Sequence, residues 1–277
     1  MSECPMFAVT CLCGCCARVH LDQGWICPIL WKGLSKPDGS QNAVQLRQQA
    51  WLDTWKRTKA FATPVEFCDS APVLTTRSAT LHVRSISNED CIDAACRLAS
   101  MHGNCGILNM SSARRAGGGV WRGARAQEEE LCRRSNLFAA LMCSRDQYPL
   151  HGKVLVHKDV VFFKKGAPDY ARVKRRNQRK LTVFTSPAVK ATWPCNHLEE
   201  MRRRINTLVA EVEKTGVVAM VFGAWGCGRF GLNPQVVANL FKERLLQSSV
   251  PIVHFGIVDD HNGSGNYDAF RKIMCSV

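Results

Sequence analysis

The sequence predicts an α/β fold in which helices cover both faces of a mostly parallel or mixed sheet. From residue 105 onward, short apolar segments typical of buried strands alternate with longer amphipathic segments typical of helices. Two glycine-rich loops each follow a predicted strand and precede a predicted helix, the position where such sheets bind ligands. The 277 residues suffice for one large domain with an N-terminal extension.

The first predicted elements are a helix and short strands. Val44, Trp51, Leu52 and Trp55 recur at helical spacing, which predicts a helix over 42–61. Strands are expected over 73–76 and 80–83, and Ser87 is expected to cap a helix over 88–101. The later expected elements are strand 105–110, helix 126–143, strands 154–157, 160–163 and 181–186, helix 196–214, strand 217–222, helix 234–246, strand 251–258 and helix 267–274.

Residues 1–40 show no clear period and are expected to form an extension ahead of a domain over 41–277, with an accessory part over 41–104 and the core over 105–277. The cluster Cys11, Cys13, Cys15 and Cys16 lacks the paired spacing of a zinc site, so no metal is expected there. No apolar segment approaches the roughly 20 residues of a membrane span, and no basic segment marks a secretion signal.

The cysteine usage points to a reducing compartment. The count of 15 is odd, and most cysteines stand singly in apparent core segments. These are Cys91, Cys96, Cys105, Cys132, Cys143 and Cys227. We therefore expect an intracellular protein, cytoplasmic or nuclear, that is not secreted.

The formal charge of +14 indicates attraction to polyanions. Basic residues concentrate over 172–180. The simplest interpretation of that segment is a solvated loop, and the alternatives are a contact for a phosphate polymer or a nuclear-import signal. Nucleic acid is the default partner of such a chain, but no aromatic-studded strand motif or recognition helix supports that function.

The most informative segment is 116–134. Gly117, Gly118 and Gly119 bury no side chain, so they indicate a backbone that closely approaches a ligand. After seven residues come Gln127, Glu128 and Glu129 at a predicted helix start. Acidic residues are common in first helical turns because they complement the dipole, which is the simplest alternative. Adjacent helical glutamates point about 100° apart, so unequal roles are expected, and Glu130 is expected at the surface.

The second glycine loop covers 223–231. Its N–H groups and the following helix start suit a diphosphate. It is neither a Walker loop nor a dinucleotide fingerprint, and an ordinary tight strand–helix turn is the alternative.

These motifs resemble the microbial-type poly(ADP-ribose) glycohydrolases, a branch of the macrodomain superfamily. The resemblance rests on the three glycines followed by Gln127, Glu128 and Glu129, and on Asn109 in the preceding strand. It also rests on the 131–135 segment and on the 223–228 loop with Phe230, and it extends over about 42–277. It implies a three-layer α/β/α macrodomain-like sandwich with a mixed sheet and an N-terminal helical and strand extension.

The resemblance also implies an activity: hydrolysis of the 1″–2′ ribose–ribose bond at chain ends, which releases ADP-ribose. Glu129 would be the catalytic acid and base, and Glu128, with help from Asn109, would orient the terminal ribose. The first loop would pass under the ribose and diphosphate, and Phe230 would pack on the ribose. The substrate-binding set would be Asn109, Gly117, Gly118, Gly119, Gln127, Gly223, Ala224, Trp225, Gly226, Cys227, Gly228, Arg229 and Phe230.

The partners expected from this resemblance are poly(ADP-ribose) and ADP-ribosylated proteins, with no cofactor, no metal and no membrane, for a monomeric protein. The main alternative is a macrodomain that binds ADP-ribose without turnover. Intact Gln127, Glu128 and Glu129 argue against that alternative, because a pure binding module has no need of the acid.

Overall fold

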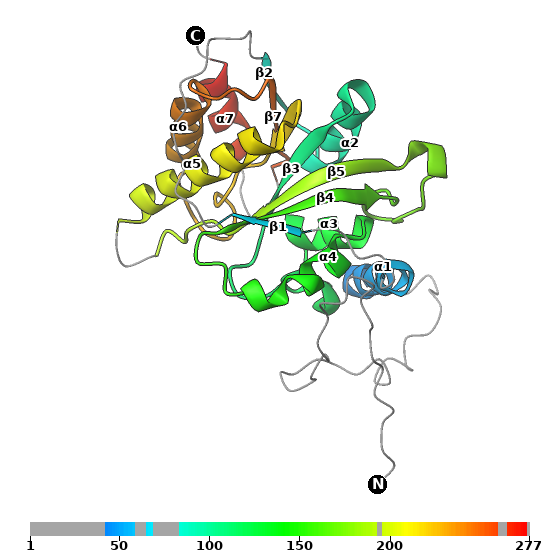
Figure 1. The fold of residues 1–277 in the computed structure, drawn as a ribbon. Helices are drawn as coiled ribbons and strands as arrows, with labels where there is room; N and C mark the ends of the chain where they lie inside the picture. Colours follow the sequence, from blue (N-terminus) through cyan, green and yellow to red (C-terminus); the bar gives the residue numbers. More distant parts are fainter. Residues whose placement is uncertain (1–41, 59–64, 69–82, 193–195, 260–264, 276–277) are drawn as a thin grey trace.

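The computed structural model describes residues 42–58, 65–68, 83–192, 196–259 and 265–275. Within them a seven-stranded mixed sheet has the order β1-β4-β5-β3-β6-β7-β2 (Figure 1). β5, β3, β6, β7 and β2 are parallel, and β4 runs antiparallel to both of its neighbours. The strands are β1 (Val65–Cys68), β2 (Val83–Ser87), β3 (Cys105–Met110), β4 (Val154–Phe162), β5 (Arg179–Ser186), β6 (Ala219–Phe222) and β7 (Ile252–Gly256).

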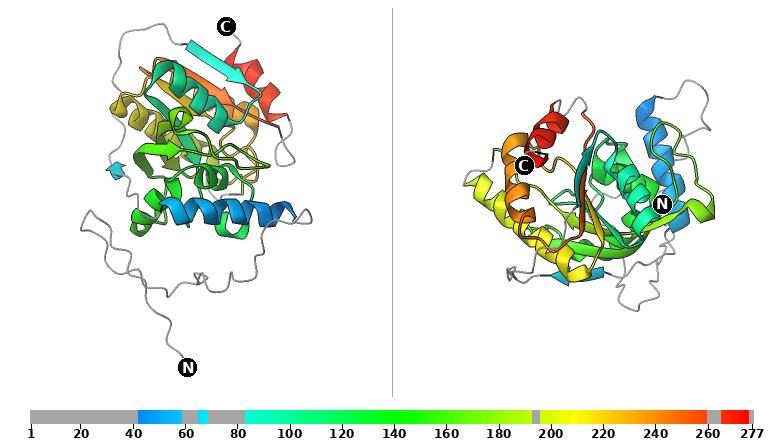
Figure 2. Two further views of the ribbon diagram at one scale, coloured as in Figure 1. Left: turned by 90° about the vertical axis from the view of Figure 1, so that its right-hand side faces the viewer. Right: turned by 90° about the horizontal axis from the view of Figure 1, so that it is seen from above.

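Helices cover both faces of this sheet, which confirms the predicted three-layer architecture (Figures 1 and 2). One layer contains α5 (His197–Thr215), α6 (Pro234–Leu245) and α7 (Asn266–Met274), and the other contains α1 (Ala43–Thr58), α2 (Cys91–His102), α3 (Gln127–Arg134) and α4 (Leu137–Cys143). Neighbouring strand residues point to opposite faces, so Ile107 packs in the core beside α2 while Leu108 packs in the core beneath α5.

The two strands predicted over 154–157 and 160–163 are one strand, β4, with a bulge. The pairing with β5 shifts register between His157 and Val160, and Asp159 there has a φ of 57°. Val156 packs in the core beneath α5 and α6, whereas Val160 packs in the opposite core. An inserted residue turns the side chains that follow it to the opposite face of the sheet. In the sequence pattern, such a bulge looks the same as a break between two strands.

The prediction of one continuous helix over 126–143 is wrong, because α3 and α4 are separate helices. Ser135 is extended at φ −143° and forms an isolated bridge with Phe162 of β4. Its hydroxyl donates to Leu131 O at 2.7 Å and accepts from Leu137 N at 3.1 Å. The serine therefore supplies local hydrogen bonds to the end of one helix and the start of the next.

The predicted cap of α2 is also wrong. Ser87 ends β2, and the carboxylate of Asp90 instead accepts from Ile92 N at 2.9 Å and Asp93 N at 3.2 Å. The helix therefore begins at Cys91, three residues later than predicted. β2 extends beyond the strand predicted over 80–83 because it pairs in parallel with β7.

Several predictions lie outside the described residues: the extension over 1–40 with its cysteine cluster, and the strand over 73–76. Of the cysteines predicted to be in the core, Cys96 is half-buried and Cys143 is exposed, so the prediction was wrong for Cys143. Across the described segments, no helix is long and apolar enough to cross a membrane. The same segments contain no group of three or more His, Cys, Asp or Glu side chains able to hold a metal ion.

Candidate active site

The glycine–glutamate segment forms a loop after β3 and the first turn of α3. β3 runs parallel to β5 and β6, so this loop emerges at the carboxyl edge of the sheet. α3 begins at Gln127, and Ala126 offers no side-chain cap. Glu128 and Glu129 are nevertheless buried, at 3% and 6% exposure. Two adjacent carboxyls buried at a helix start require partners from elsewhere, and the glycine loop supplies them.

The loop glycines lie directly on the carboxylates. Gly118 has a φ of 57°, and a Cβ placed there would contact Glu129 Oε1 and lie 2.9 Å from Glu128 Oε2. A Cβ on Gly117, at a φ of 72°, would lie 2.5 Å from the ring of Phe138. These two positions therefore need glycine for both space and backbone conformation.

Glu129 has one bound and one unpartnered carboxyl oxygen. Gly119 N donates to Oε1 at 2.8 Å. Oε2 is buried and has no hydrogen-bond partner in the described part of the chain. A fixed carboxyl with a free buried oxygen is suited to exchange a proton with a ligand atom placed beside it.

Glu128 is held at both oxygens. Gly117 N donates to Oε1 at 3.2 Å and Ser112 N donates to Oε2 at 2.7 Å. Burial raises the pKa of Glu128 to about 8, the charge of Glu129 adds to the rise, and hydrogen bonds from Ser112, Gly117 and Asn109 oppose it. A helix start alone lowers the pKa of a carboxyl. Desolvation outweighs that effect at Glu128.

The N–H groups of the three glycines are all occupied. Those of Gly117 and Gly119 donate to the two glutamates, and Gly118 N donates to Arg115 O at 3.1 Å. N–H groups of a glycine loop can bind an anion only when they are free, and those of this loop are not. The first loop uses its donors to position carboxylates.

Gln127 and Asn109 connect the loop to the sheet. Gln127 accepts from Met110 N at 2.9 Å and donates to Leu108 O at 2.6 Å, so its amide is committed to β3. Asn109 is fully buried and donates to Thr185 Oγ1 at 3.2 Å, while its Oδ1 has no partner within the described segments. Asn109 therefore has an acceptor available at the site, and Gln127 does not.

The second glycine loop begins beside the first. It leaves β6, the neighbour of β3, and a Cβ on Gly223 would lie 2.9 Å from Met110 Cε. Gly226 N and Gly228 N donate to no acceptor among the described residues, and the same holds for Arg229 N and Phe230 N. Gly228, Ala224 and Phe230 are partly exposed, Arg229 is exposed, and Lys190 Nζ lies 5.8 Å from the centre of the Phe230 ring. This loop retains the free donors that the first loop lacks.

Trp225 and Cys227 do not present their side chains to the site. Trp225 is fully buried with its ring 6.3 Å from that of Phe241, and Cys227 belongs to the same core. Both residues belong to the predicted substrate-binding set, but alternate residues of the tight turn point inward and bury these two side chains. Only their backbone can face a ligand.

Glu130 was expected at the surface, and this is wrong as well. Its Oε1 accepts from Tyr170 Oη at 2.6 Å and pairs with Arg133 at 2.8 Å. Arg133 also donates to Arg47 O at 3.3 Å, and Arg134 pairs with Asp90 at 3.0 Å. These contacts of two buried arginines fix α3 against α1 and the start of α2, and so fix the direction of its first turn.

Sequence reasoning missed the support beneath the glycine loop. Trp51 and Trp55 of α1 pack edge-on against Phe138 at 5.6 and 5.3 Å, and the Phe138 ring lies under Gly117. The helical spacing of the tryptophans signalled a buried face but not its partner. The buried hydroxyl of Tyr148, which has no partner in the described segments, was missed too; burial raises its pKa, and the charge of Glu128 adds to the rise.

Fold and site together define a macrodomain-like α/β protein in which two glycine loops meet beside two buried carboxylates. Residues 35–165 match the family model of the microbial-type PARG (poly(ADP-ribose) glycohydrolase) catalytic domain. The matched part contains the whole glycine–glutamate motif, and it confirms the family predicted from the sequence. That family consists of glycosidases that act on poly(ADP-ribose).

Solved structures agree with this assignment. The poly(ADP-ribose) glycohydrolase of Thermomonospora curvata superposes with a TM-score of 0.71 at 22% identity, covering 82% of this chain and 98% of that one. A complex of the same enzyme with the inhibitor ADP-HPD gives 0.67 at 22% identity with the same coverage. A Deinococcus radiodurans poly(ADP-ribose) glycohydrolase variant in complex with ADP-ribose gives 0.63 at 26% identity, covering 70% and 84%. None of the curated protein sequences matches the chain.

Proposed function

We propose that this protein hydrolyses the 1″–2′ ribose–ribose bonds of poly(ADP-ribose), with Glu129 as the catalytic acid and base. The observation that carries the proposal is the state of that carboxyl: Gly119 N fixes Oε1, while Oε2 is buried and unpartnered. The family match over the same motif and the ADP-ribose complex of a similar fold support it.

In the proposed reaction, Glu129 protonates the ribose oxygen that leaves when the 1″–2′ bond breaks. The oxocarbenium-like cation that remains is stabilised by the substrate's own diphosphate. Glu129, now a carboxylate, takes a proton from the water that attacks this cation, and ADP-ribose is released. Both glutamates come from one helix, so the usual pair of carboxyls across a glycosidic bond does not apply.

Glu128 and Asn109 have positioning roles in this proposal. Glu128 is fixed by two backbone donors, which suits an oxygen that orients ribose hydroxyls. The unpartnered Oδ1 of Asn109 can accept from such a hydroxyl. The free N–H groups of Gly226, Gly228 and Arg229 would bind the diphosphate, with Phe230 against the ribose. Because the donors of the first loop are occupied, Gly117, Gly118 and Gly119 contribute space under the ribose.

Glu129→Gln tests the proposal by keeping the shape of the side chain and removing its acid. We expect release of ADP-ribose from poly(ADP-ribose) on automodified polymerase to fall by about 10²–10⁴-fold, the range for loss of general acid–base catalysis. Glu199→Gln is the matched control, since Glu199 is an exposed glutamate in the first turn of α5. Normal release by Glu129→Gln would exclude Glu129 from this role.

The same experiment separates the enzyme from a non-catalytic reader of ADP-ribose. A reader would bind ADP-ribose and release none from the polymer, with or without Glu129. Product lengths separate cleavage at chain ends, which the family resemblance implies, from cleavage inside chains. Light scattering and cell fractionation test the monomeric state and the intracellular location that we propose.

A further inference from the structure

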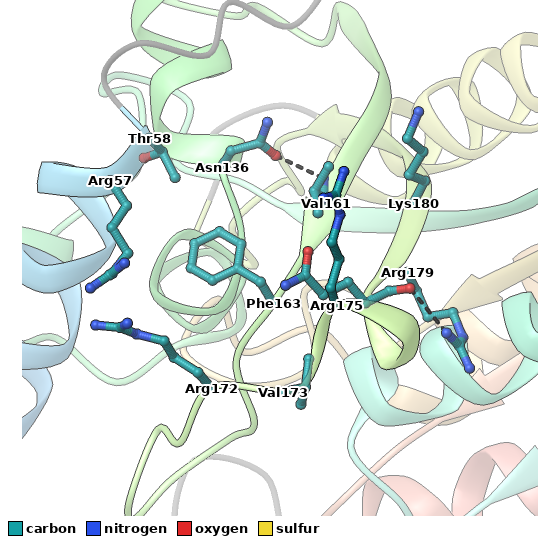
Figure 3. A pocket seen from close by; sticks show the side chains of 11 residues that line it. Arg57, Thr58, Asn136, Val161, Phe163, Arg172, Val173, Arg175, Arg179 and Lys180 are labelled. Atoms are coloured by element: carbon teal, nitrogen blue, oxygen red, sulfur yellow. Dashed lines mark hydrogen bonds between the residues drawn. The ribbon is translucent and has the colours of Figure 1, made fainter.

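A pocket lies at the start of β5, whereas the glycine loops lie near the end of that strand. It has a volume of about 670 Å³ and lies between the end of α1, the end of β4 and the start of β5 (Figure 3). Ser186 at the end of β5 pairs with Met110 beside the active site, while Arg179 at its start lines the pocket. Seven residues of a strand span about 23 Å, so the pocket lies at the far end of β5 from Met110, and Asn136, beyond the end of α3, also lines it. We name it the distal pocket.

The distal pocket is lined by five cationic side chains and by no carboxylate. These are Arg57, Arg172, Arg175, Arg179 and Lys180. The sequence had marked the 172–180 segment as basic without showing that it folds around a cavity or that Arg57 of α1 joins it. A volume of this size lies within the range of about 300–1,000 Å³ typical of small-molecule sites.

The carboxylates beside the distal pocket do not neutralise it. Asp53 is shared by Arg57 at 3.3 Å, Arg172 at 3.1 Å and Lys164 at 2.8 Å. Asp159 lies 3.3 Å from Lys180, and that pair is largely exposed. One carboxylate shared among three cations leaves most of their charge uncompensated.

Two arginines are available to a ligand. Arg175 is exposed and makes no ion pair or side-chain hydrogen bond with the described residues. Arg179 donates to the backbone carbonyls of Arg176 at 3.1 Å and Gln178 at 3.0 Å, and pairs with no carboxylate within the described segments. Guanidinium groups without a carboxylate partner favour phosphate, which they bind with two parallel hydrogen bonds.

The distal pocket also has an apolar interior. The half-buried ring of Phe163 lies between Arg57 and Arg172 on one side and Arg175 on the other (Figure 3). Val161 and Val173 extend the apolar lining. An aromatic face flanked by guanidinium groups matches a nucleotide, since a base can stack on the ring while its phosphates meet the cations.

We propose that the distal pocket binds one adenosine diphosphate unit of poly(ADP-ribose), away from the unit being cleaved. The inference rests on the proposed function for the identity of the polymer. Phe163 is the one aromatic among the residues that line the pocket, whereas sites for single-stranded RNA stack successive bases on several aromatics along a groove. A pocket that holds one base beside two phosphates suits the repeat unit of poly(ADP-ribose). Binding there retains long chains on the enzyme while their ends are cleaved.

The test compares Arg175→Gln/Arg179→Gln with Arg271→Gln/Lys272→Gln, which removes the same charge from α7 at the far side of the sheet. We measure binding of long poly(ADP-ribose) at several salt concentrations, binding stoichiometry with ADP, and ADP-ribose release from long chains and from a two-unit oligomer. Thermal denaturation verifies that both variants fold.

For the pocket variant we expect polymer affinity to fall about ten-fold and the salt slope to decrease by about 1.4, since each lost phosphate contact on a single strand contributes about 0.7. KM for long chains rises by a similar factor, release from the two-unit oligomer is unchanged, and one of two ADP sites is lost. Phe163→Leu, which keeps the charge, weakens ADP binding at the same site.

An unchanged salt slope in the pocket variant would overturn the proposal, and so would an equal loss in the α7 control. If polyadenylate RNA competes for the distal pocket as well as poly(ADP-ribose) does, the ligand of the pocket is RNA and the proposal is overturned. Polymer binding does not require turnover. A wild-type protein that binds the polymer through this pocket but releases no ADP-ribose would therefore refute the proposed activity alone.

Discussion

Replacing Gly118 with alanine tests whether the glycine loop serves to hold the catalytic carboxyls. The new Cβ would contact Glu129 Oε1 and lie 2.9 Å from Glu128 Oε2 and 3.3 Å from Glu129 Cδ. Carboxyl oxygens cannot remain that close to a methyl carbon, so Glu129 must move by several tenths of an ångström or more. Its hydrogen bond from Gly119 N, now 2.8 Å, is then weakened or lost.

Two effects of the Gly118 substitution have separate magnitudes. Alanine in the left-handed region at φ 57° costs about 1–2 kcal/mol of folding free energy, whatever surrounds it. Displacement of the acid by about 1 Å costs about 10²-fold in rate. We therefore expect Gly118→Ala to remain folded, with a modest loss of stability, and to release ADP-ribose about 10²-fold more slowly.

Gly216→Ala is the matched control. Gly216 ends α5 with a φ of 67°, and a Cβ there would meet nothing within 4 Å. Urea denaturation should show a similar loss of about 1–2 kcal/mol in both variants, whereas the release assay should show a rate loss in Gly118→Ala only. Turnover by Gly118→Ala within three-fold of wild type would refute the reasoning. An equal rate loss in Gly216→Ala would show that lowered stability is the cause.

Two further predictions follow from burial at the site. The pKa of Glu128 is raised from 4.5 to about 8 in the folded protein, so the fold binds more protons than the unfolded chain between these values. The free energy of unfolding should therefore fall as pH rises from about 5 to 8, with a slope of up to about 1.4 kcal/mol per pH unit that Glu128→Gln removes. Urea denaturation across this range is the measurement, and identical slopes in both proteins would contradict it. Trp225→Phe should lower stability by about 1–3 kcal/mol because the indole fills the core, yet leave KM for the polymer unchanged. A raised KM in a variant that remains stable would show that the Trp225 side chain contributes to polymer binding and would contradict this prediction.

Features that depend on neighbouring residues were predictable. The strand over 105–110 was predicted with its observed bounds, because a short apolar run before a glycine loop marks a buried strand. The start of α6 at Pro234 was predicted for a similar reason, since proline favours the first helical turn. Both glycine loops were predicted to follow strands, and the structure adds that these strands, β3 and β6, are parallel neighbours.

Features that depend on contacts between distant residues were not predictable. Glu130 accepts a hydrogen bond from Tyr170, which is 40 residues away in the sequence. Phe138 lies between Gly117 and the tryptophans of α1. Such contacts have no signature in spacing. The distal pocket is the largest case, since Arg57 and the 172–180 segment meet only in three dimensions.

The sequence by itself determined the fold class, the family and the glycine–glutamate motif, because periodicity and glycine clusters are local properties of the chain. Tertiary structure decided which groups are free to act. It occupied the donors of the first glycine loop with Glu128 and Glu129, left Glu129 Oε2 unpartnered, and turned Trp225 into the core. The physical reason is that burial and hydrogen-bond saturation are set by what surrounds a residue in space, and a one-dimensional pattern does not contain that information.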